Sequence, residues 1–215
     1  MVALSIDDVL EDIQRRWGAN AIQSARHIVP PTGILSHDGA VDGLVGGLCR
    51  GKVNAMSGVP TSGKTTLAYH WLAAAQQAGE RIVYMDINGT FDPAYAAQCG
   101  LQLEELVLVR PESLTDALWL VRDIGLSDAV SLQVIDAVVL NARLEKLMLG
   151  QMTLLALTNV AVTSAQVQMT CRCESWRKQS QAVVGCKMRL TLTRHPSRPA
   201  GNSIMLDMTF TERNR

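Results

Sequence analysis

The feature that most constrains this chain is the run Gly-Val-Pro-Thr-Ser-Gly-Lys-Thr at residues 58–65, which fits the pattern G-x-x-x-x-G-K-[ST]. In this pattern, glycines let backbone N–H groups turn inward around a phosphate, and the helix that follows adds the positive end of its dipole. The lysine reaches the terminal phosphate oxygens, and the last hydroxyl ligates Mg²⁺. The motif therefore predicts a site for a nucleoside triphosphate with Mg²⁺.

Individual roles follow from this chemistry. We expect Lys64 to contact the β and γ phosphates and Thr65 to ligate the metal. The metal also needs a carboxylate at the carboxyl end of a neighbouring strand. Asp136, which ends the apolar run 132–135, is the expected residue, and Asp86 is the alternative. The expected phosphate-binding residues are Gly58, Val59, Pro60, Thr61, Ser62, Gly63, Lys64, Thr65 and Thr66.

Short apolar runs alternate with helical periods along most of the chain. This alternation predicts an α/β fold with a mostly parallel central sheet and helices on both faces. Two alternating runs, residues 187–193 and 203–211, predict a C-terminal β-hairpin. The other expected strands are 52–56, 81–87, 106–110, 130–135 and 161–167, and the expected helices are 65–78, 93–99, 113–124 and 141–159.

The first residues form a separate segment. Ile6, Leu10, Ile13 and Trp17 have helical spacing and predict a short amphipathic helix, and a Pro-Pro pair at residues 30–31 ends the segment. We therefore expect residues 1–31 to be a helix with a linker and residues 32–215 to be the main domain. Because an exposed apolar stripe needs a partner, the helix is expected to dock on an adjacent subunit and support oligomerisation, with folding back on its own core as the alternative.

Charge is balanced overall but is unevenly distributed. The chain has 20 basic and 20 acidic residues, yet residues 166–215 hold 9 basic and 3 acidic residues. This asymmetry indicates an anionic partner near the C-terminus. Polar residues interrupt the longest apolar stretch, 152–165, so no membrane span is expected. An acidic N-terminus without a basic region and five scattered cysteines favour the cytoplasm.

Several segments together carry a family resemblance. Residues 84–96, Tyr-Met-Asp-Ile-Asn-Gly-Thr-Phe-Asp-Pro-Ala-Tyr-Ala, are similar to the pattern F-I-D-A-E-H-A-L-D-P-x-Y-A, and residues 58–66 depart little from G-P-E-S-S-G-K-T-T. Residues 13–22 and 32–38 are similar to the segments that come before the phosphate loop in the same proteins. With these motifs the chain resembles the bacterial RecA recombinase family. The resemblance implies a RecA-like P-loop NTPase core that binds ATP and Mg²⁺, in a minimal form without the C-terminal domain.

The resemblance also implies roles for residues outside the phosphate loop. Asp92 and Tyr95 match the residues that contact adenine, and Gln166 matches a glutamine that senses the γ-phosphate. Arg213 and Arg215 match a K-N-K triplet that reaches the ATP of a neighbouring subunit. ATP would then lie between subunits of a homo-oligomeric filament or ring.

The family's catalytic glutamate falls at Asn88. An amide orients the attacking water but cannot accept its proton, and a general base contributes about 10² to 10⁴ in rate. Slow hydrolysis is therefore expected. Asp86 lies two residues earlier on the same strand face and is a candidate substitute base.

The segments that would bind DNA also differ from the family pattern. The first loop, near residues 140–146, is expected to be short, and the second is expected at residues 167–181. There Arg172, Arg177 and Lys178, with Trp176, combine cations with an aromatic ring, as in proteins that bind single-stranded DNA. A zinc site at Cys171, Cys173, Cys186 and His195 is a weaker alternative, because the spacing is not typical.

Two functions remain open on these grounds. The first is a weakly hydrolysing, DNA-dependent ATPase of the RecA type that binds single-stranded DNA in recombination or repair. The second is a paralogue that binds ATP, hydrolyses it little and regulates a recombinase or repair polymerase through protein contacts. A small-molecule kinase would need an acceptor pocket and a lid arginine, and the sequence indicates neither.

Overall fold

The computed structural model describes residues 6–17, 33–137, 150–179 and 182–210. Contacts divide the chain into two units, Met1–Pro31 and Thr32–Arg215. The first unit contains helix α1 (Ile6–Trp17), as the apolar spacing predicts, and Asp12 forms ion pairs with Arg15 and Arg16 on its surface. The second unit contains all the other described elements.

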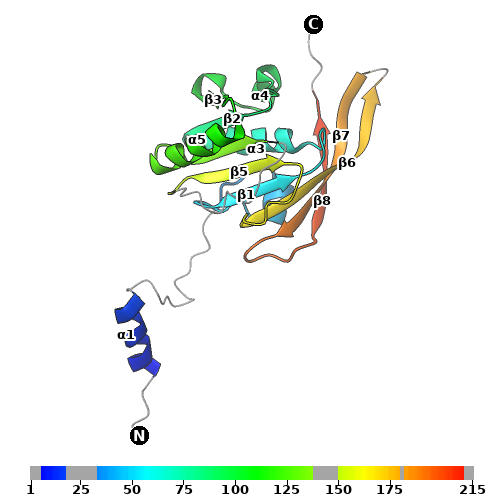
Figure 1. The fold of residues 1–215 in the computed structure, drawn as a ribbon. Helices are drawn as coiled ribbons and strands as arrows, with labels where there is room; N and C mark the ends of the chain where they lie inside the picture. Colours follow the sequence, from blue (N-terminus) through cyan, green and yellow to red (C-terminus); the bar gives the residue numbers. More distant parts are fainter. Residues whose placement is uncertain (1–5, 18–32, 138–149, 180–181, 211–215) are drawn as a thin grey trace. The chain divides into compact units, whose positions relative to one another are not determined.

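A single mixed sheet of eight strands forms the frame of the second unit, in the order β3-β2-β4-β5-β1-β6-β7-β8 (Figure 1). The first six strands in this order are parallel, and β7 and β8 run antiparallel to their neighbours. This confirms the predicted α/β class and mostly parallel sheet. The strands are β1 (Val53–Ser57), β2 (Ile82–Asp86), β3 (Val107–Val109), β4 (Leu132–Asp136), β5 (Thr153–Thr158), β6 (Val167–Gln179), β7 (Ala182–Arg194) and β8 (Ser203–Thr209).

Helices connect the parallel strands and begin at recognisable caps. The carboxylate of Asp92 and the hydroxyl of Ser113 accept hydrogen bonds from first-turn N–H groups of α4 (Pro93–Gln98) and α5 (Leu114–Leu126). Asp38 caps the short α2 (Gly39–Val45) in the same way, whereas α3 (Lys64–Gln77) follows Gly63 without a side-chain cap. The remaining described helix is a 3₁₀ turn, η2 (Leu103–Glu105). Within the described ranges, every helix is too short or too polar to span a bilayer.

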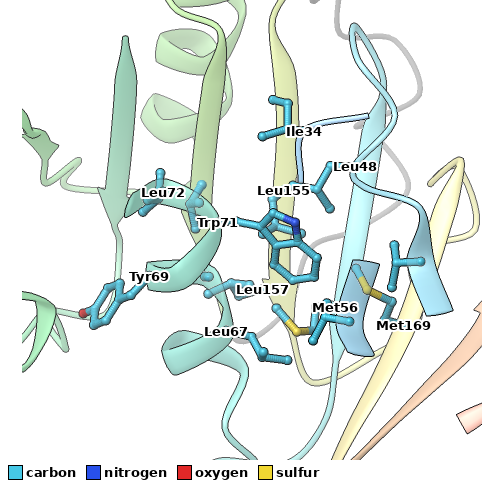
Figure 2. Close-up of a cluster of buried hydrophobic side chains, with 14 of the residues drawn as sticks. Ile34, Leu48, Met56, Leu67, Tyr69, Trp71, Leu72, Leu155, Leu157 and Met169 are labelled. Atoms are coloured by element: carbon cyan, nitrogen blue, oxygen red, sulfur yellow. The ribbon is translucent and has the colours of Figure 1, made fainter. Parts of the chain in front are cut away.

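Helices α3 and α5 bury opposite faces of the sheet. Ala117 and Val121 of α5 pack with Met85 and Ile135 in one apolar cluster. The larger cluster lies under α3 and centres on Trp71, whose fully buried ring lies beside Leu48, Met56 and Leu155 (Figure 2). Burial of this apolar surface is the main stabilising contribution to the domain.

Two sequence predictions after Asp136 are wrong. From residue 150 onward, the helix predicted over residues 141–159 is replaced by strand β5, Thr153–Thr158, while residues 141–149 of that prediction lie outside the described residues. The strand predicted over 161–167 is instead a segment of bends and a turn up to residue 166. The run Thr-Leu-Leu-Ala-Leu-Thr fits a helix by propensity, but every residue in it is buried between β4 and β1. Tertiary burial on both faces therefore decides in favour of a strand.

The loop predicted at residues 167–181 is also wrong, because residues 167–179 form strand β6. The first half of β6 lies between β1 and β7 and alternates buried and more exposed residues. Its second half extends past β1, pairs with β7 alone and is mostly exposed on both faces. The predicted C-terminal hairpin is confirmed as β7 and β8, and β8 pairs only with Gly185–Thr191 of β7. Pairing with β1 ends at Thr170, so the rest of β6 is an edge strand beside β7, which explains its exposed and polar residues.

Candidate functional site

The phosphate loop follows β1 and is held tightly against β5 and β6. The N–H of Gly58 donates to the carbonyl of Thr158, at 3.1 Å. A Cβ atom at Gly58 would lie 2.4 Å from the carbonyl oxygen of Cys171, and Gly63 has a φ of 94° with Met188 Sδ only 2.5 Å from an ideal Cβ position. Glycine is therefore required at both places, which explains the spacing of the motif.

The first turn of α3 provides a site for an anion. Gly63 has no side chain to occupy the N–H groups at the start of this 14-residue helix. The helix dipole favours negative charge at the same end. Thr65 lies in this turn, so its hydroxyl is beside any phosphate held there.

Lys64 folds back over the loop that precedes it. Its Nζ donates to the carbonyls of Gly58 and Val59, at 2.6 and 3.1 Å, and the residue is only 9% exposed. Burial lowers the pKa of the ammonium group, while the charge of the Asp136 carboxylate opposes this shift. A phosphate would give this cation a stronger partner than two carbonyl groups.

Asp136 ends β4 in register with Asp86 of β2 and Leu157 of β5. The Tyr84 hydroxyl donates to Asp136 Oδ2 at 2.9 Å. Burial raises the pKa of the Asp136 carboxyl, Tyr84 and Lys64 oppose the shift, and the charge of Asp86 adds to it. Burial also raises the pKa of the Tyr84 hydroxyl, which keeps it protonated as a donor.

These residues fit a Mg²⁺ ion in donor chemistry. Mg²⁺ prefers oxygen ligands and keeps several waters, so one carboxylate and one hydroxyl beside a phosphate are sufficient. Asp136 would supply the carboxylate and Thr65 the hydroxyl, and the charge of Asp136 acts on the nearby Lys64. The bound ion would neutralise charge on the phosphates.

Asp86 serves the turn that follows β2. Its carboxylate, which is 1% exposed, accepts N–H groups of Thr90 and Phe91 at 2.8 and 3.2 Å and pairs with Arg110 at 3.3 Å. Because both oxygens are engaged, this geometry favours a structural role for Asp86 over those of metal ligand and general base. The turn it holds contains Asn88, whose Nδ2 donates to the main-chain carbonyl of Asp136 at 3.3 Å.

A cavity of about 290 Å³ opens beside the phosphate loop. The Tyr95 hydroxyl is 3.0 Å from the Thr66 hydroxyl, and Asp92 caps the helix that carries Tyr95. The Phe210 ring lies between Tyr95 and Trp176, with centroid distances of 6.0 and 6.5 Å. The cavity is lined by Thr61, Ser62, Gly63, Lys64, Thr65, Thr66, Tyr95, Trp176, Cys186 and Phe210.

Sequence reasoning missed two of these lining residues, Cys186 and Phe210. It also assigned Trp176 to a DNA loop, whereas the ring lines the cavity beside the phosphate loop. In the β6–β7 ladder, Trp176 is directly opposite Cys186. Phe210 is one of only two phenylalanines and follows the alternating run that ends the domain. An aromatic residue after the last strand is the signal that could have identified it.

The structure contradicts the position expected for Gln166. Its N–H donates to the carbonyl of Val53, at 2.7 Å, so the residue lies at the start of β1. The phosphate loop follows the other end of that five-residue strand, roughly 13 Å away at 3.3 Å per residue. The error follows from the wrong strand assignment, because the segment that leaves the sheet beside the loop is Thr158 and Asn159, at the end of β5.

The candidate DNA-binding residues lie on β6 rather than on a loop. Arg172 is opposite Arg189 in the β6–β7 register, and Lys178 is opposite Val183. Arg177 donates to the Thr209 hydroxyl at 2.9 Å and is 3.8 Å from the Asp207 carboxylate. The first DNA loop near residues 140–146 and the residues Arg213 and Arg215 lie outside the described residues.

The structure gives the zinc alternative no support. Among the residues that are described, no three His, Cys, Asp or Glu side chains gather as a metal site would require. The buried Cys171 thiol lies beside Lys64, and burial raises its pKa to about 12. It therefore packs as a neutral side chain.

Comparisons with known proteins agree with the geometry. Residues 4–166 match the family model of the RecA N-terminal domain. The chain is 38% identical over 140 residues to Protein RecA of Streptomyces ambofaciens and 34% identical over 140 residues to that of Aquifex aeolicus. Each match covers 62% of this chain but only 37% and 40% of the relative, respectively.

A solved structure has the same fold. The RadB recombinase superposes with a TM-score of 0.64 at 17% identity, covering 82% of this chain and 96% of that one. The match to the RecA N-terminal domain extends over more than half of the residues and includes the phosphate loop, Asp86, Asp136 and Tyr95. The protein therefore belongs to the RecA family.

Proposed function

We propose that this protein binds ATP with Mg²⁺ and acts on single-stranded DNA in homologous recombination or repair. The observation that carries the proposal is the cavity in which the phosphate loop, Lys64 and the ring of Tyr95 meet. The phosphates would lie along residues 58–66, with Lys64 at the terminal phosphates. Thr65 and Asp136 would hold the metal, as derived above.

The base would lie against the rings of this cavity. Tyr95 and Phe210 provide aromatic faces from α4 and from the segment after β8. Asp92, one turn before Tyr95, would contact the base edge as in the family pattern. Arg213 and Arg215 follow Phe210 closely in the sequence, which supports a place near the nucleotide, in the same or a neighbouring subunit.

Hydrolysis is expected to be slow because the position of the family's glutamate is occupied by an amide. Asn88 lies at the carbonyl of Asp136, beside the metal carboxylate. An amide there cannot take a proton from water, and Asp86 is engaged by its turn.

We expect Asn88→Glu to raise ATP turnover about a hundredfold, since it restores a base of the kind that contributes at least this much. Phosphate release by purified protein, with and without single-stranded DNA, measures the effect. Asn88→Gln is the matched control, because it has the same length without the carboxylate and should leave the rate unchanged. Equal rates for Asn88→Glu and wild type would contradict the assigned position.

The outer face of the β6–β7 ribbon supports the DNA part of the proposal. Arg172 and Arg189 are directly opposite each other, and only Glu174 offsets them, at 2.7 Å from Arg189. Like charges across a ladder destabilise it unless an anion lies over them, and a phosphate backbone is such an anion. Lys178 is exposed farther along the same strand, and Arg177 lies beside it.

We expect labelled single-stranded DNA to bind in the presence of ATP and Mg²⁺ and to be released by salt. In fluorescence anisotropy, the double variant Arg172→Ala with Lys178→Ala should weaken binding at least tenfold and lower the salt slope by about two. Arg122→Ala, an exposed arginine on α5, is the control and should bind as wild type. Absence of ATP-dependent binding by wild type would contradict the DNA role.

The alternative function is that of a recombinase paralogue that binds ATP and regulates a repair partner, such as another recombinase or a polymerase. The amide at Asn88 favours it, and so does the short connection of eight residues, 159–166, between β5 and β6. Such a protein would retain nucleotide binding without turnover or DNA affinity. The turnover and anisotropy measurements above distinguish the two functions.

We also propose a homo-oligomer, in a filament or a ring. Val107 on the edge strand β3 and Trp119 on α5 are apolar side chains 55% and 56% exposed, which a neighbouring subunit would cover. Opposite net charge in the two parts of the chain favours head-to-tail contact. Sedimentation of the full chain with and without ATP tests this proposal.

A further inference from the structure

We infer that Tyr84 is a positioning residue for the metal carboxylate: its hydroxyl holds Asp136 in the orientation that Mg²⁺ requires, and Asn88 supports the same residue through its main chain. This inference rests on the metal site of the proposed function. It concerns two donors of the β2 segment that meet on one residue of β4. In this proposal neither donor is a metal ligand, so the effect of each would be exerted through Asp136.

Tyr84 and Asn88 both donate hydrogen bonds to Asp136. The Tyr84 hydroxyl donates to Asp136 Oδ2 at 2.9 Å, and the Asn88 amide donates to the carbonyl of the same residue at 3.3 Å. Because Asp86 and Asp136 are paired in the β2–β4 register, Tyr84 comes two residues before the paired position and Asn88 two residues after it. The two donors therefore hold Asp136 at its side chain and at its main chain.

The Tyr84 ring cannot easily move away from this contact. The residue is fully buried, and its ring packs against Tyr69 and Phe91 at centroid distances of 5.7 and 5.2 Å. A hydroxyl fixed by packing orients its acceptor with little loss of side-chain entropy on binding. The hydrogen bond from Tyr84 to Oδ2 thereby restricts rotation of the Asp136 side chain in the metal-free protein.

Such an arrangement has a measurable consequence. Partners that hydrogen-bond a metal-binding carboxylate set its direction, and their removal costs about 10- to 100-fold in metal affinity. Phenylalanine at position 84 keeps the packing of the ring and deletes only the donor. We therefore expect Tyr84→Phe to raise the Mg²⁺ concentration that half-saturates nucleotide binding by about tenfold.

The experiment uses the full chain, a fluorescent ATP analogue and titration with Mg²⁺ alone, starting from a metal-free sample in EDTA. Affinity for the analogue in EDTA should stay within twofold of wild type, because Tyr84 does not line the phosphate cavity. Lys52→Ala is the control, since it removes an exposed side chain just before β1, at the opposite end of that strand from the phosphate loop, and should leave the Mg²⁺ midpoint unchanged.

A second variant keeps the inference testable if Tyr84→Phe folds poorly. Asn88→Ala removes the other donor from an exposed position and should raise the Mg²⁺ midpoint about threefold. A Tyr84→Phe protein that folds and has the wild-type Mg²⁺ midpoint would overturn the positioning role. If instead the wild-type protein binds the analogue equally well with and without Mg²⁺, the proposed metal site itself fails.

Discussion

Lys64→Ala should weaken ATP binding by at least about a hundredfold, which corresponds to about 2.7 kcal/mol. The ammonium group is buried against the phosphate loop and is the cation nearest the expected terminal phosphates. Removal of one partner from a buried charged pair costs roughly 2–5 kcal/mol, so the effect should exceed that of any exposed cation. Calorimetric titration with ATP and Mg²⁺ measures it directly.

Lys52→Ala is the control for this measurement. Lys52 is an exposed lysine just before β1, at the opposite end of the strand from the phosphate loop, and its loss should change the affinity by less than twofold. Thermal unfolding of both variants shows whether the loop remains folded without the Lys64 contacts to Gly58 and Val59. A Lys64→Ala protein that binds ATP within threefold of wild type would refute the assignment of the cavity.

Trp71→Ala should destabilise the domain by about 3–5 kcal/mol, the range observed when a large aromatic side chain is removed from a core. The ring is fully buried beside Leu48, Met56 and Leu155 (Figure 2), and no smaller side chain can fill its place. For a chain of this size the melting temperature should fall by about 10 °C. Urea unfolding followed by circular dichroism gives the free energy.

Two comparisons make this prediction specific to the buried ring. Trp119→Ala removes the same side chain from an exposed position on α5, where 56% of it is accessible, and should cost less than about 1 kcal/mol. Trp71→Phe should be tolerated better than Trp71→Ala, because the indole Nε1 has no hydrogen-bond partner to lose. Equal losses at positions 71 and 119 would mean that the cluster under α3 does not dominate stability.

The elements whose patterns are local could be predicted from the sequence. Helix α3 follows the glycine motif and ends near Gly79, and β2 and β4 are mainly apolar runs that end in Asp86 and Asp136. The phosphate loop itself was identified because its chemistry fixes residue types at fixed spacing. For these elements, local propensity and tertiary position agree.

The rest depends on long-range pairing that no local pattern contains. Leucines and alanine favour a helix at Thr153–Thr158, and only insertion between β1 and β4 makes the segment a strand. Because of that single misassignment, the γ-phosphate sensor was predicted at Gln166 and not at the end of β5. Gln166 lies where β1 begins, at the opposite ends of the strands from the phosphate loop. Likewise, Trp176 lines the cavity beside the phosphate loop together with Cys186, and only the antiparallel pairing of β6 with β7 places these two residues opposite each other.

The close approach of Gly58 to Cys171 has a thermodynamic meaning. A methyl group at Gly58 would collide with the β6 backbone, so this part of the phosphate loop lies in direct contact with β6. If nucleotide binding and order in the β6–β7 ribbon are coupled through this contact, the coupling free energy has the same magnitude in both directions. A nucleotide that orders the ribbon would then bind more tightly to a protein whose ribbon is already held by a partner.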